Sequence, residues 1–286
     1  MATDPMATDP VANDPVANDP VASGAIAGGA IAGGAVARGS TTVPSTTASA
    51  VSESVLKVCG LRAGYGQTPI LQGIELDVRR GEIVSLIGRN GVGKTTILRC
   101  LIGQLPASAG TVQFQGRDIT RLSPDARARL GIGYVPQGRE VFPRLTVEEN
   151  LFVGRLIGGP KGRKRADLVY RYFPRLHERR RQAAGTMSGG EQQQLAIGRA
   201  LIGNPPLLLL DEPSEGVQPS IVQLICETLK SVRDELGSTV LFVEQNLDTI
   251  MALGERAYVI EKGRVSRHVG PEEISDQDVV RRSLMI

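Results

Sequence analysis

The sequence predicts an α/β fold built around a parallel sheet, and three observations lead to that prediction. A short apolar β-forming segment over residues 83–87 is followed by a glycine-rich loop and then by apolar residues at helical spacing over 96–102. The apolar run over 207–210 is continuous, as in strands that are buried on both faces of a parallel sheet. Strand-like and helix-like segments alternate along the chain, which is the pattern of α/β proteins.

The first elements of the domain have the character of antiparallel strands with one buried face. Residues 55–59 and 74–78 alternate apolar and polar positions, which predicts half-buried antiparallel strands. Residues 111–116 resemble a hairpin strand that ends in a glycine turn. Ser123 and Pro124 are expected to open a short helix, with the serine as its cap and the proline in its first turn.

The later elements alternate helices with central strands, beginning with a strand over 132–135. Thr146 and Glu149 have the spacing of a capping box, so a helix is expected from there to residue 156. Residues 160–182 are rich in lysine and arginine and are expected to form exposed helical surface. Helices over 192–202 and 221–236 and a central strand over 239–243 complete the expected elements.

Residues 1–54 differ in composition from the rest of the chain. MATDP, VANDP and AIAGG each occur twice, and a Ser/Thr-rich stretch follows. Small residues with a proline or glycine closing each unit bury too little apolar area to offset the entropy of ordering. We therefore predict a disordered, low-complexity extension over 1–54 without a function of its own, and a folded domain over 55–286.

Composition and charge exclude several classes of protein. The chain of 286 residues has 3% aromatic residues and no tryptophan, so its core must be aliphatic. Residues 1–54 carry five acidic side chains and one arginine, a net −4, so the remainder carries +7 of the overall +3. That basic balance suits a nucleotide and an anionic membrane surface. It lacks the aromatic-interleaved basic stripe of a nucleic-acid partner, and no apolar run approaches the roughly 18 residues that span a bilayer.

The cysteines and histidines do not indicate a metal or redox site. Cys59, Cys100 and Cys226 are odd in number and widely spaced, so we expect small buried residues in a reducing compartment. The only histidines, His177 and His268, are expected at the surface.

The glycine-rich loop after residue 87 predicts a phosphate-binding site. Its pattern is G-x-x-x-x-G-K-[ST], and the flanking strand and helix let consecutive backbone N–H groups face a phosphate. Lys94 is expected to reach the β- and γ-phosphates of a nucleotide, and the Thr95 hydroxyl to hold Mg²⁺. The loop residues predicted to bind the nucleotide are Gly88, Arg89, Asn90, Gly91, Val92, Gly93, Lys94, Thr95 and Thr96.

Two carboxylates stand where the apolar strand over 207–210 ends. Open α/β sheets bind their ligands at the carboxyl ends of the strands. Asp211 is therefore expected to hold Mg²⁺, and Glu212 to act as the general base that polarises an attacking water.

A second anion site precedes the helix over 192–202. Met187-Ser-Gly-Gly-Glu191 combines small residues with a helix N-terminus. One nucleotide does not need two phosphate sites in one chain, so this segment is expected to complete the nucleotide site of another subunit. The chain at this point resembles the ATP-binding cassette (ABC) ATPases, whose signature LSGGQ corresponds to MSGGE here. The resemblance implies that Ser188, Gly189, Gly190 and Glu191 face a partner's ATP.

The resemblance covers about residues 55–270 and implies further roles. It implies a P-loop ABC ATPase fold with a RecA-like core, an antiparallel β subdomain and a helical signature subdomain at about 138–186. Tyr65 would stack on adenine, although a tyrosine that packs the domain edge is the alternative. Gln137 would bind ATP, sense Mg²⁺ and pass the signal to a membrane partner.

The sequence departs from the family pattern at three places. Gln245 stands where the family has its switch histidine, so a catalytic role would fall to an amide without a titrating proton. The segment 215–218 reads EGVQ in place of the usual SALD. Glu191 brings a carboxylate in place of an amide, which either weakens γ-phosphate binding or points away. Slower hydrolysis, or hydrolysis that depends on a partner, is the expected consequence.

These departures resemble one ATPase of the branched-chain amino-acid importers. The segments GRNGVGKTT, VPQGREVFPRLTVEENL, SGGEQQQLAIGRAL, DEPSEGVQPSIV and the C-terminal VVRRSLMI resemble the urea-importer branch more closely. The resemblance implies an ATPase that powers uptake of urea or related short amides, with ATP and Mg²⁺ as cofactors. Its partners would be a second ABC ATPase or a second copy, two transmembrane permease subunits and, indirectly, a solute-binding protein.

Three alternatives remain open from the sequence. The importer could carry branched-chain amino acids. The chain could be a weakly hydrolytic ATP-binding module that completes a partner's site. A soluble ABC protein in translation or DNA repair is disfavoured by the single cassette and the lack of a long coiled coil. We expect a peripheral subunit on the cytoplasmic face of the plasma membrane, without a nucleic-acid partner.

Overall fold

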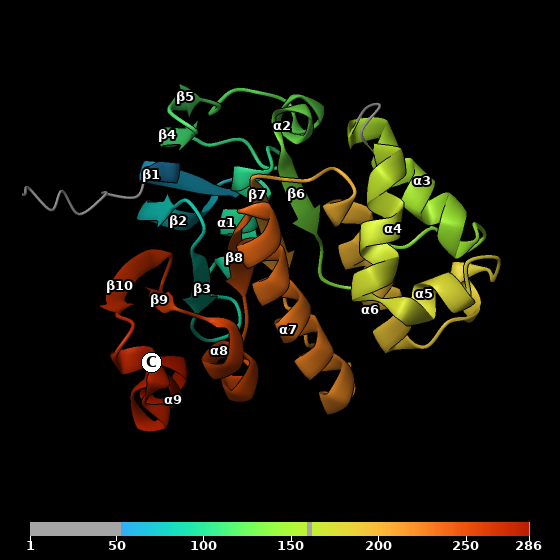
Figure 1. The fold of residues 1–286 in the computed structure, drawn as a ribbon. Coiled ribbons are helices and arrows are strands. Elements are labelled where there is room, and N and C mark those ends of the chain that lie inside the picture. The colour runs from blue at the N-terminus through green and yellow to red at the C-terminus, as the bar shows by residue number, and fades with distance from the viewer. Residues whose placement is uncertain (1–52, 159–161, 286) are drawn as a thin grey trace, which may run out of the picture. The chain divides into compact units, whose positions relative to one another are not determined.

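A six-stranded sheet forms the centre of the fold (Figure 1). Its order is β10-β9-β3-β8-β7-β6. The strands are β3 (Ile83–Ile87), β6 (Ile132–Val135), β7 (Leu207–Asp211), β8 (Thr239–Val243), β9 (Arg256–Glu261) and β10 (Arg264–Val269). All pairings within the sheet are parallel except that of β10 with β9. The strands predicted over 83–87, 132–135 and 239–243 are confirmed with the same bounds.

The computed structural model describes residues 53–158 and 162–285, without the side chains of 157–158 and 162–164. The predicted extension over 1–54 lies outside the described residues apart from its last two, as do the residues 160–161 of the basic stretch. Within the described ranges, no helix is both long and apolar enough to cross a bilayer.

Helices cover both faces of the parallel strands. Alternate residues of β7 point to opposite faces: Leu209 packs in the cluster that contains helix α1 (Lys94–Leu101), and Leu208 in the cluster that contains helix α7 (Pro219–Leu236). Every residue of β3, β7 and β8 is buried. This burial on both faces explains the continuous apolar run in the sequence.

A second sheet is antiparallel, with the order β2-β1-β4-β5. Its strands are β1 (Ser54–Tyr65), β2 (Thr68–Arg79), β4 (Ala109–Phe114) and β5 (Arg117–Asp118). The strands β1 and β2 are longer than the predicted segments 55–59 and 74–78, because irregularities in their pairing carry the ladder past the break in alternation. One irregularity falls at Gly60, whose φ of 60° suits glycine.

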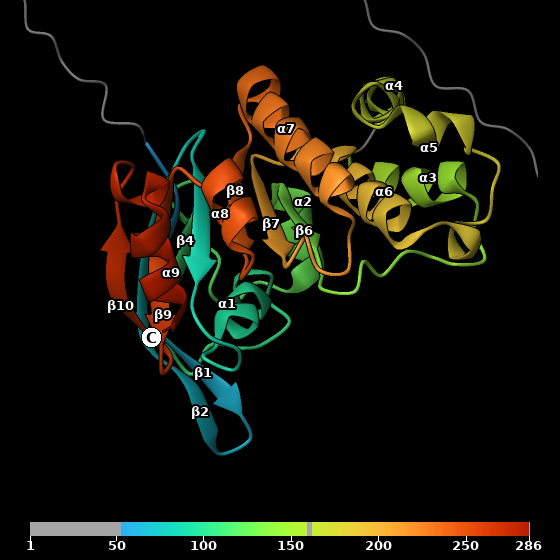
Figure 2. The same cartoon turned by 90° about the horizontal axis from the view of Figure 1, so that it is seen from below.

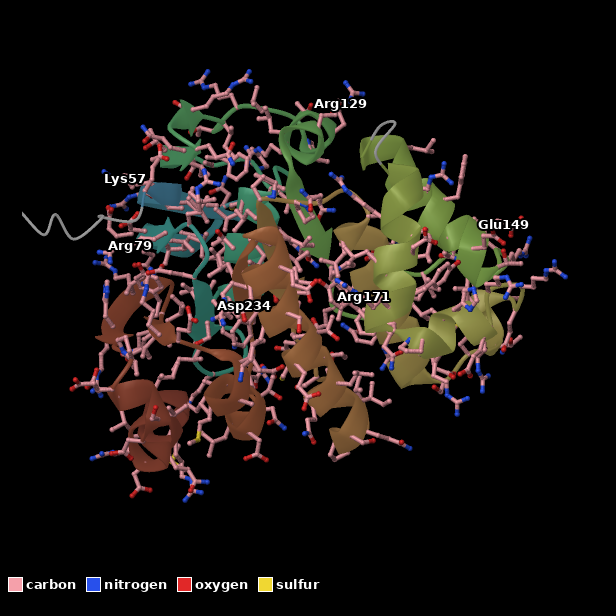
Figure 3. All side chains as sticks on the ribbon, in the orientation of Figure 1. Lys57, Arg79, Arg129, Glu149, Arg171 and Asp234 are labelled. Atoms are coloured by element: carbon pink, nitrogen blue, oxygen red, sulfur yellow. The ribbon has the colours of Figure 1, made fainter. Side chains whose placement is uncertain are left out.

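Five helices gather on the opposite side of the central sheet from the antiparallel one (Figures 1 and 2). They are α3 (Val147–Gly158), α4 (Gly162–Tyr172), α5 (Pro174–Glu178), the 3-10 turn η2 (Ala184–Thr186) and α6 (Gly189–Leu201). The capping box of α3 is confirmed: Thr146 N–H donates to Glu149 (2.7 Å), and Glu149 N–H donates to Thr146 Oγ1 (3.2 Å). Arg171 on α4, labelled in Figure 3, forms an ion pair with Glu235 on α7 that joins these helices to the core.

The remaining helices are α2 (Pro124–Leu130), α8 (Leu247–Leu253), the 3-10 turn η3 (Glu273–Ser275) and α9 (Gln277–Met285). Helix α2 begins at the predicted proline, and Ser123 occupies the cap position as predicted. Its hydroxyl makes no capping hydrogen bond to the backbone and donates instead to the Asp125 carboxylate. Two adjacent polar side chains satisfy each other more readily than the serine reaches back to the helix.

The cysteine and histidine predictions hold with one exception. All three cysteines are free thiols, and burial raises the pKa of Cys100 and of Cys226 to about 11. Cys59 is half-buried rather than buried; it lies on β1, where buried positions are interspersed with more exposed ones. His177 and His268 are exposed, as predicted.

Candidate functional site

Four neighbouring parallel strands each deliver one part of a common site. In sheet order, β3 is followed by the phosphate loop, β8 by Gln245, β7 by Asp211 and Glu212, and β6 by Gln137. Because the carboxyl ends of parallel strands meet at one edge of the sheet, residues far apart in sequence become neighbours there. The architecture therefore brings the predicted phosphate, metal and base residues together.

The phosphate loop is fixed by glycines and by a buried lysine. Gly88 (φ 144°) admits no side chain, since a Cβ there would lie 2.3 Å from the Ile260 carbonyl oxygen. Lys94 is 5% exposed, and its Nζ donates to the carbonyl oxygens of Gly88 and Arg89, each at 2.8 Å. Burial lowers the pKa of Lys94, while the charges of Glu212 and Asp211 act in the opposite direction.

Thr95 and Asp211 form a set of oxygen ligands that fits Mg²⁺. Thr95 Oγ1 donates to Asp211 Oδ1 (3.1 Å). The other carboxylate oxygen, Oδ2, is buried without a hydrogen-bond partner among the described residues. Burial raises the pKa of Asp211 to about 6, despite the Thr95 hydrogen bond. A cavity of about 290 Å³ is lined by all three predicted metal-site residues, Thr95, Gln137 and Asp211.

The residues described include no cluster of three or more His, Cys, Asp or Glu side chains that could hold a metal. A cation at this cavity would therefore share few protein oxygens with phosphate and water oxygens. Mg²⁺ is commonly bound in that way, through one or two carboxylates plus substrate phosphates. The donor set thus fits Mg²⁺ that arrives with a nucleotide better than a permanently held metal.

Glu212 is held by two amide side chains. Gln245 Nε2 donates to Glu212 Oε1 (2.6 Å), and Gln137 Nε2 donates to Glu212 Oε2 (3.2 Å). The backbone of Glu212 has a φ of 49°, a left-handed conformation that costs energy for a residue other than glycine. Strain of this kind is common at functional sites. Both donors are neutral, so they orient the carboxylate without supplying a proton.

Gln245 also connects the base to the phosphate loop, because its Nε2 donates to Asn90 Oδ1 as well. A residue that the sequence did not single out, Glu244, fixes this arrangement. It is 3% exposed, and its Oε1 accepts from the N–H groups of Gln245 (2.8 Å) and Asn246 (3.0 Å). Its Oε2 accepts from the Ser214 hydroxyl (2.7 Å) on the loop after β7. Glu244 therefore ties together the loops that carry Glu212 and Gln245.

The sequence reasoning also missed the contacts of the 215–216 turn. Gln137 Nε2 donates to Glu215 Oε2 (3.0 Å), and Arg139 donates to the backbone oxygens of Glu215 (3.2 Å) and Gly216 (3.3 Å). Arg139 itself has a φ of 72°. It also lies against the signature, since a Cβ on Gly189 would meet its guanidinium at 2.8 Å. The segment after β6 thus contacts both the turn after the base and the signature.

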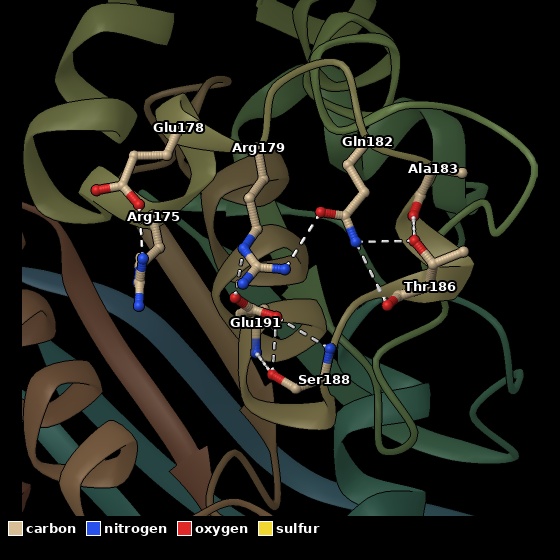
Figure 4. Close-up of polar contacts among 8 residues, drawn as sticks. All are labelled: Arg175, Glu178, Arg179, Gln182, Ala183, Thr186, Ser188 and Glu191. Atoms are coloured by element: carbon tan, nitrogen blue, oxygen red, sulfur yellow. Dashed lines mark hydrogen bonds and ion pairs between the residues drawn. The ribbon is translucent and has the colours of Figure 1, made fainter.

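The signature segment starts helix α6 with a full capping box. Ser188 Oγ accepts from Glu191 N–H (3.4 Å), and Glu191 Oε2 accepts from Ser188 N–H (3.0 Å). The second carboxylate oxygen of Glu191 pairs with Arg179 Nε at 3.0 Å (Figure 4). The carboxylate is therefore turned back onto its own helix. No hydrogen bond or ion pair of residues 188–191 in the described structure reaches the phosphate loop.

Tyr65 lies apart from the hydrogen-bonded site residues. It ends β1, is 46% exposed, and its hydroxyl accepts from Arg99 Nη1 (3.1 Å) on α1. An open aromatic face beside the helix that follows the phosphate loop is available to a base, so stacking on adenine remains a prediction.

The sequence gives little indication of the roles of four residues at these sites: Glu244, Glu215, Arg139 and Arg179. Glu244 is a carboxylate directly after an apolar central strand, the same signal that identified Asp211. A search of every strand end for acids would have found it. The partners of Arg139 and Arg179 lie in other segments, so no local pattern could reveal them.

Comparison with known proteins gives consistent matches along the folded part of the chain. A family profile described as ABC transporter matches residues 71–215. The branched-chain amino acid transport ATP-binding protein BraG of Pseudomonas aeruginosa is 48% identical over 71% of this chain and 88% of its own length. A probable branched-chain amino acid transport protein, LivF of Archaeoglobus fulgidus, is 34% identical over 81% and 98%. LptB, of the lipopolysaccharide export system of Escherichia coli, is 37% identical over 80% and 96%.

Two solved structures illustrate the similarity of fold. The ADP conformation of MJ1267, an ATP-binding cassette of an ABC transporter, has a TM-score of 0.71 and 28% identity over 80% of this chain and 98% of that one. A dimeric, post-hydrolysis cassette bound to ADP and Pi, MJ0796, has a TM-score of 0.68 and 28% identity over 76% and 98%. The relatives share the cassette but differ in the transport system to which they belong.

Proposed function

This chain belongs to the ABC transporter family and is an ATP-hydrolysing, ATP-binding subunit of it, and from that premise we propose that it powers the import of urea or a related short amide. The observation that supports this proposal most strongly is that the two predicted phosphate sites lie in different parts of the chain. The phosphate loop and Glu212 share one edge of the sheet, whereas Ser188 to Glu191 begin a helix among α3–α6. Two such chains, or this chain and a related subunit, would each complete the other's nucleotide site.

In the proposed reaction, Lys94 exchanges its carbonyl partners for the β- and γ-phosphates of ATP. Glu212 accepts a proton from the water that attacks the γ-phosphorus, while ADP leaves. Gln245 and Gln137 keep both oxygens of the Glu212 carboxylate in place. Thr95 and Asp211, with Gln137, would hold Mg²⁺, which neutralises developing phosphate charge. Closure around ATP would favour one state of the membrane subunits, and hydrolysis would release it.

A groove between the sheet and α3 supports docking of a permease segment. It encloses about 330 Å³ and its lining includes Ile132, Tyr134 and Val153. Phe142 also lines it and is 43% exposed, and Phe152 and Leu156 on α3, the helix that carries Val153, are 50% and 71% exposed. Large exposed apolar side chains next to an apolar groove are typical of protein–protein contact sites. Two permease subunits, reached from the cytoplasmic face of the membrane, are the partners that we propose.

Two residues secure the segment between the site and this groove. Asn150 is fully buried; its Oδ1 accepts from Phe142 N–H (2.8 Å) and its Nδ2 donates to the Phe142 carbonyl (3.0 Å). Arg199 donates to the Glu140 carbonyl (2.8 Å) and lies over the Phe142 ring, 5.0 Å from its centroid. A permease segment that presses on Phe142 would therefore act on the backbone that carries Gln137.

The cargo is the finer part of the proposal, because a cassette does not contact the solute. The similarity of several segments to the urea-importer branch, among them GRNGVGKTT and DEPSEGVQPSIV, supports urea. The 48% identity to BraG favours branched-chain amino acids as the second candidate. Uptake of labelled urea and labelled leucine should be measured in nitrogen-limited cells whose own copy is replaced by Lys94→Ala. The matched control is Lys57→Ala, an exposed lysine on β1.

Loss of urea uptake alone, with the control intact, would establish the cargo and its dependence on ATP. Loss of leucine uptake alone would move the chain to the amino-acid branch. If Lys94→Ala changed neither, the importer proposal would be wrong.

A second functional candidate is a weakly hydrolytic module that completes a partner's site, and Gln245 in place of a histidine favours it. Turnover should be measured in an assembly that carries a substitution only in the partner's catalytic base. Persistent turnover would support an active site on this chain, and complete loss would support the module.

A further inference from the structure

The acidic residue of the signature poses an electrostatic problem. A carboxylate in the first turn of a helix stabilises that helix, because it interacts favourably with the helix dipole. The same carboxylate would repel a phosphate that approaches the helix end. Glu191 belongs to that first turn, and its side chain is 13% exposed. Some feature of this chain must therefore control its charge if the signature binds phosphate.

The first turn of α6 keeps two backbone donors available. Ser188 accepts hydrogen bonds from two of the backbone N–H groups. Its Oγ accepts from the N–H of Glu191 (3.4 Å), and its carbonyl oxygen accepts from the N–H of Gln192 (2.9 Å). The N–H groups of Gly189 and Gly190 find no acceptor among the residues that the structure describes. These two donors are the ones that a phosphate would reach. A free carboxylate beside them would be the main obstacle.

Arg179 neutralises that carboxylate and is itself held in place. It lies just after α5, and its Nε contacts Glu191 Oε1 at 3.0 Å (Figure 4). Its Nη1 donates to Gln182 Oε1 (3.2 Å), and Gln182 Nε2 donates to Thr186 Oγ1 (2.8 Å). The guanidinium is thus fixed by the chain segment that leads into the signature. The opposite carboxylate oxygen, Oε2, stays on Ser188.

The neighbouring cation has a different partner. Arg175 lies one turn earlier and pairs with Glu178 at 2.7 Å, with side chains 63% and 56% exposed. Arg179 is less exposed, at 38%, and is the residue that contacts Glu191 directly. The two arginines therefore offer a matched comparison: Arg179 pairs with an acid of the signature, and Arg175 pairs with an exposed acid of its own helix.

We propose that Arg179 is a positioning residue of the signature: it neutralises Glu191 and holds it on Ser188, so that the N–H groups of Gly189 and Gly190 can receive the phosphate of a nucleotide bound to the opposing subunit. This inference rests on the proposed function, because it presumes that the signature completes a nucleotide site. It gives a physical reason why an acidic residue is compatible with this position.

The test uses the assembly that co-purifies with the tagged full-length chain from its own host membranes. Its kcat and KM for ATP should be measured for the wild type and for Arg179→Ala, Glu191→Gln, the double variant and Arg175→Ala. Arg179→Ala should lower kcat/KM on the order of tenfold, because it leaves a like charge facing the phosphate. Glu191→Gln should be at least as active as the wild type. The double variant should return to within about twofold of it, since the unpaired charge is gone.

The rescue separates the proposal from a merely structural role. If Arg179 only stabilised the fold, Arg179→Ala would lower the unfolding temperature and Glu191→Gln would not restore activity, which would overturn the inference. Unchanged activity in Arg179→Ala, or an equal loss in Arg175→Ala, would overturn it as well. Absence of ATP turnover in the wild-type assembly would instead refute the proposed function, and the inference with it.

Discussion

The phosphate loop and the signature both begin a helix with glycines, but the chain secures them by different means. The phosphate loop is fixed by backbone: β3 precedes it, Gly93 (φ 111°) caps α1 without a side chain, and Lys94 is buried beneath it. The signature is fixed by partly exposed side chains, namely Ser188, Glu191 and Arg179. A point substitution can therefore alter the electrostatics of the signature without disturbing the fold, whereas the phosphate loop tolerates little change.

The largest effect that would test this comparison lies at the strand-end site. Glu212→Gln should reduce turnover by about 10² to 10⁴, because it removes the general base. ATP binding should remain, since Gln keeps the size of the side chain, although it can accept from only one of the two amides that hold Glu212. Single-turnover assays and equilibrium nucleotide binding would measure the two effects. Turnover at the wild-type rate would mean that Glu212 is not the base.

Asp211→Asn should reveal the energetic cost of burying the carboxylate that we propose as a Mg²⁺ ligand. Its pKa is raised to about 6 by burial, so the stability it contributes is full below its unfolded pKa and is lost as pH rises through about 6. Without Mg²⁺ and nucleotide, Asn should make the protein more stable than wild type by about 2 kcal/mol at pH 7.5, and by less at pH 5. Urea unfolding at both pH values measures this. A pH-independent difference would contradict the explanation.

Glu244→Gln tests whether the strand-end site depends on interlocked loops. Gln can accept at only one oxygen, so either the Ser214 contact or the Gln245 and Asn246 contacts would be lost. Turnover should fall about tenfold while KM for ATP changes little, as expected when positioning of the base is impaired. Glu227→Gln, an exposed acid on α7, is the control. An equal loss in both variants would argue against a specific role of Glu244.

The smallest effect compares two capping boxes of the same design. Thr146→Ala on α3 and Ser188→Ala on α6 should each destabilise the protein by about 1 kcal/mol. Only Ser188→Ala should also lower ATP turnover, because only α6 carries the signature. Equal turnover in the two variants at equal loss of stability would show that the Ser188 cap has no function beyond holding its helix.

The elements that sequence predicts best are those whose environment is uniform. Burial on both faces made β3 and β8 readable to their last residue, and β7 extends one residue past its predicted end; β9 was not predicted. The β1–β2 pair was underestimated because irregular pairing around Gly60 breaks the alternation while the ladder continues. Ser123 occupies the predicted cap position of α2, but it makes no side-chain capping bond because a neighbouring carboxylate competes for its hydroxyl.

The site followed the same division. Residues at strand ends and in the glycine loop could be predicted from sequence because the chemistry is local to their motif. Glu244 and Arg139 act on partners 30 and 76 residues away, and Arg179 acts on an acid in another element. Such contacts depend on tertiary packing, and the pattern of a single sequence does not show which distant residues the fold brings together.

The segment from Gln137 to Phe142 is held in place along almost its whole length. It is fastened to Glu212 and Glu215 at its start, to the 215–216 turn through Arg139, and to Asn150 at its end. A loop held by hydrogen bonds at such short intervals cannot extend when one end is displaced. It therefore moves as a rigid segment rather than as a hinge. The length of this short segment, rather than the flexibility of a domain, then determines how completely a displacement of Phe142 reaches Gln137.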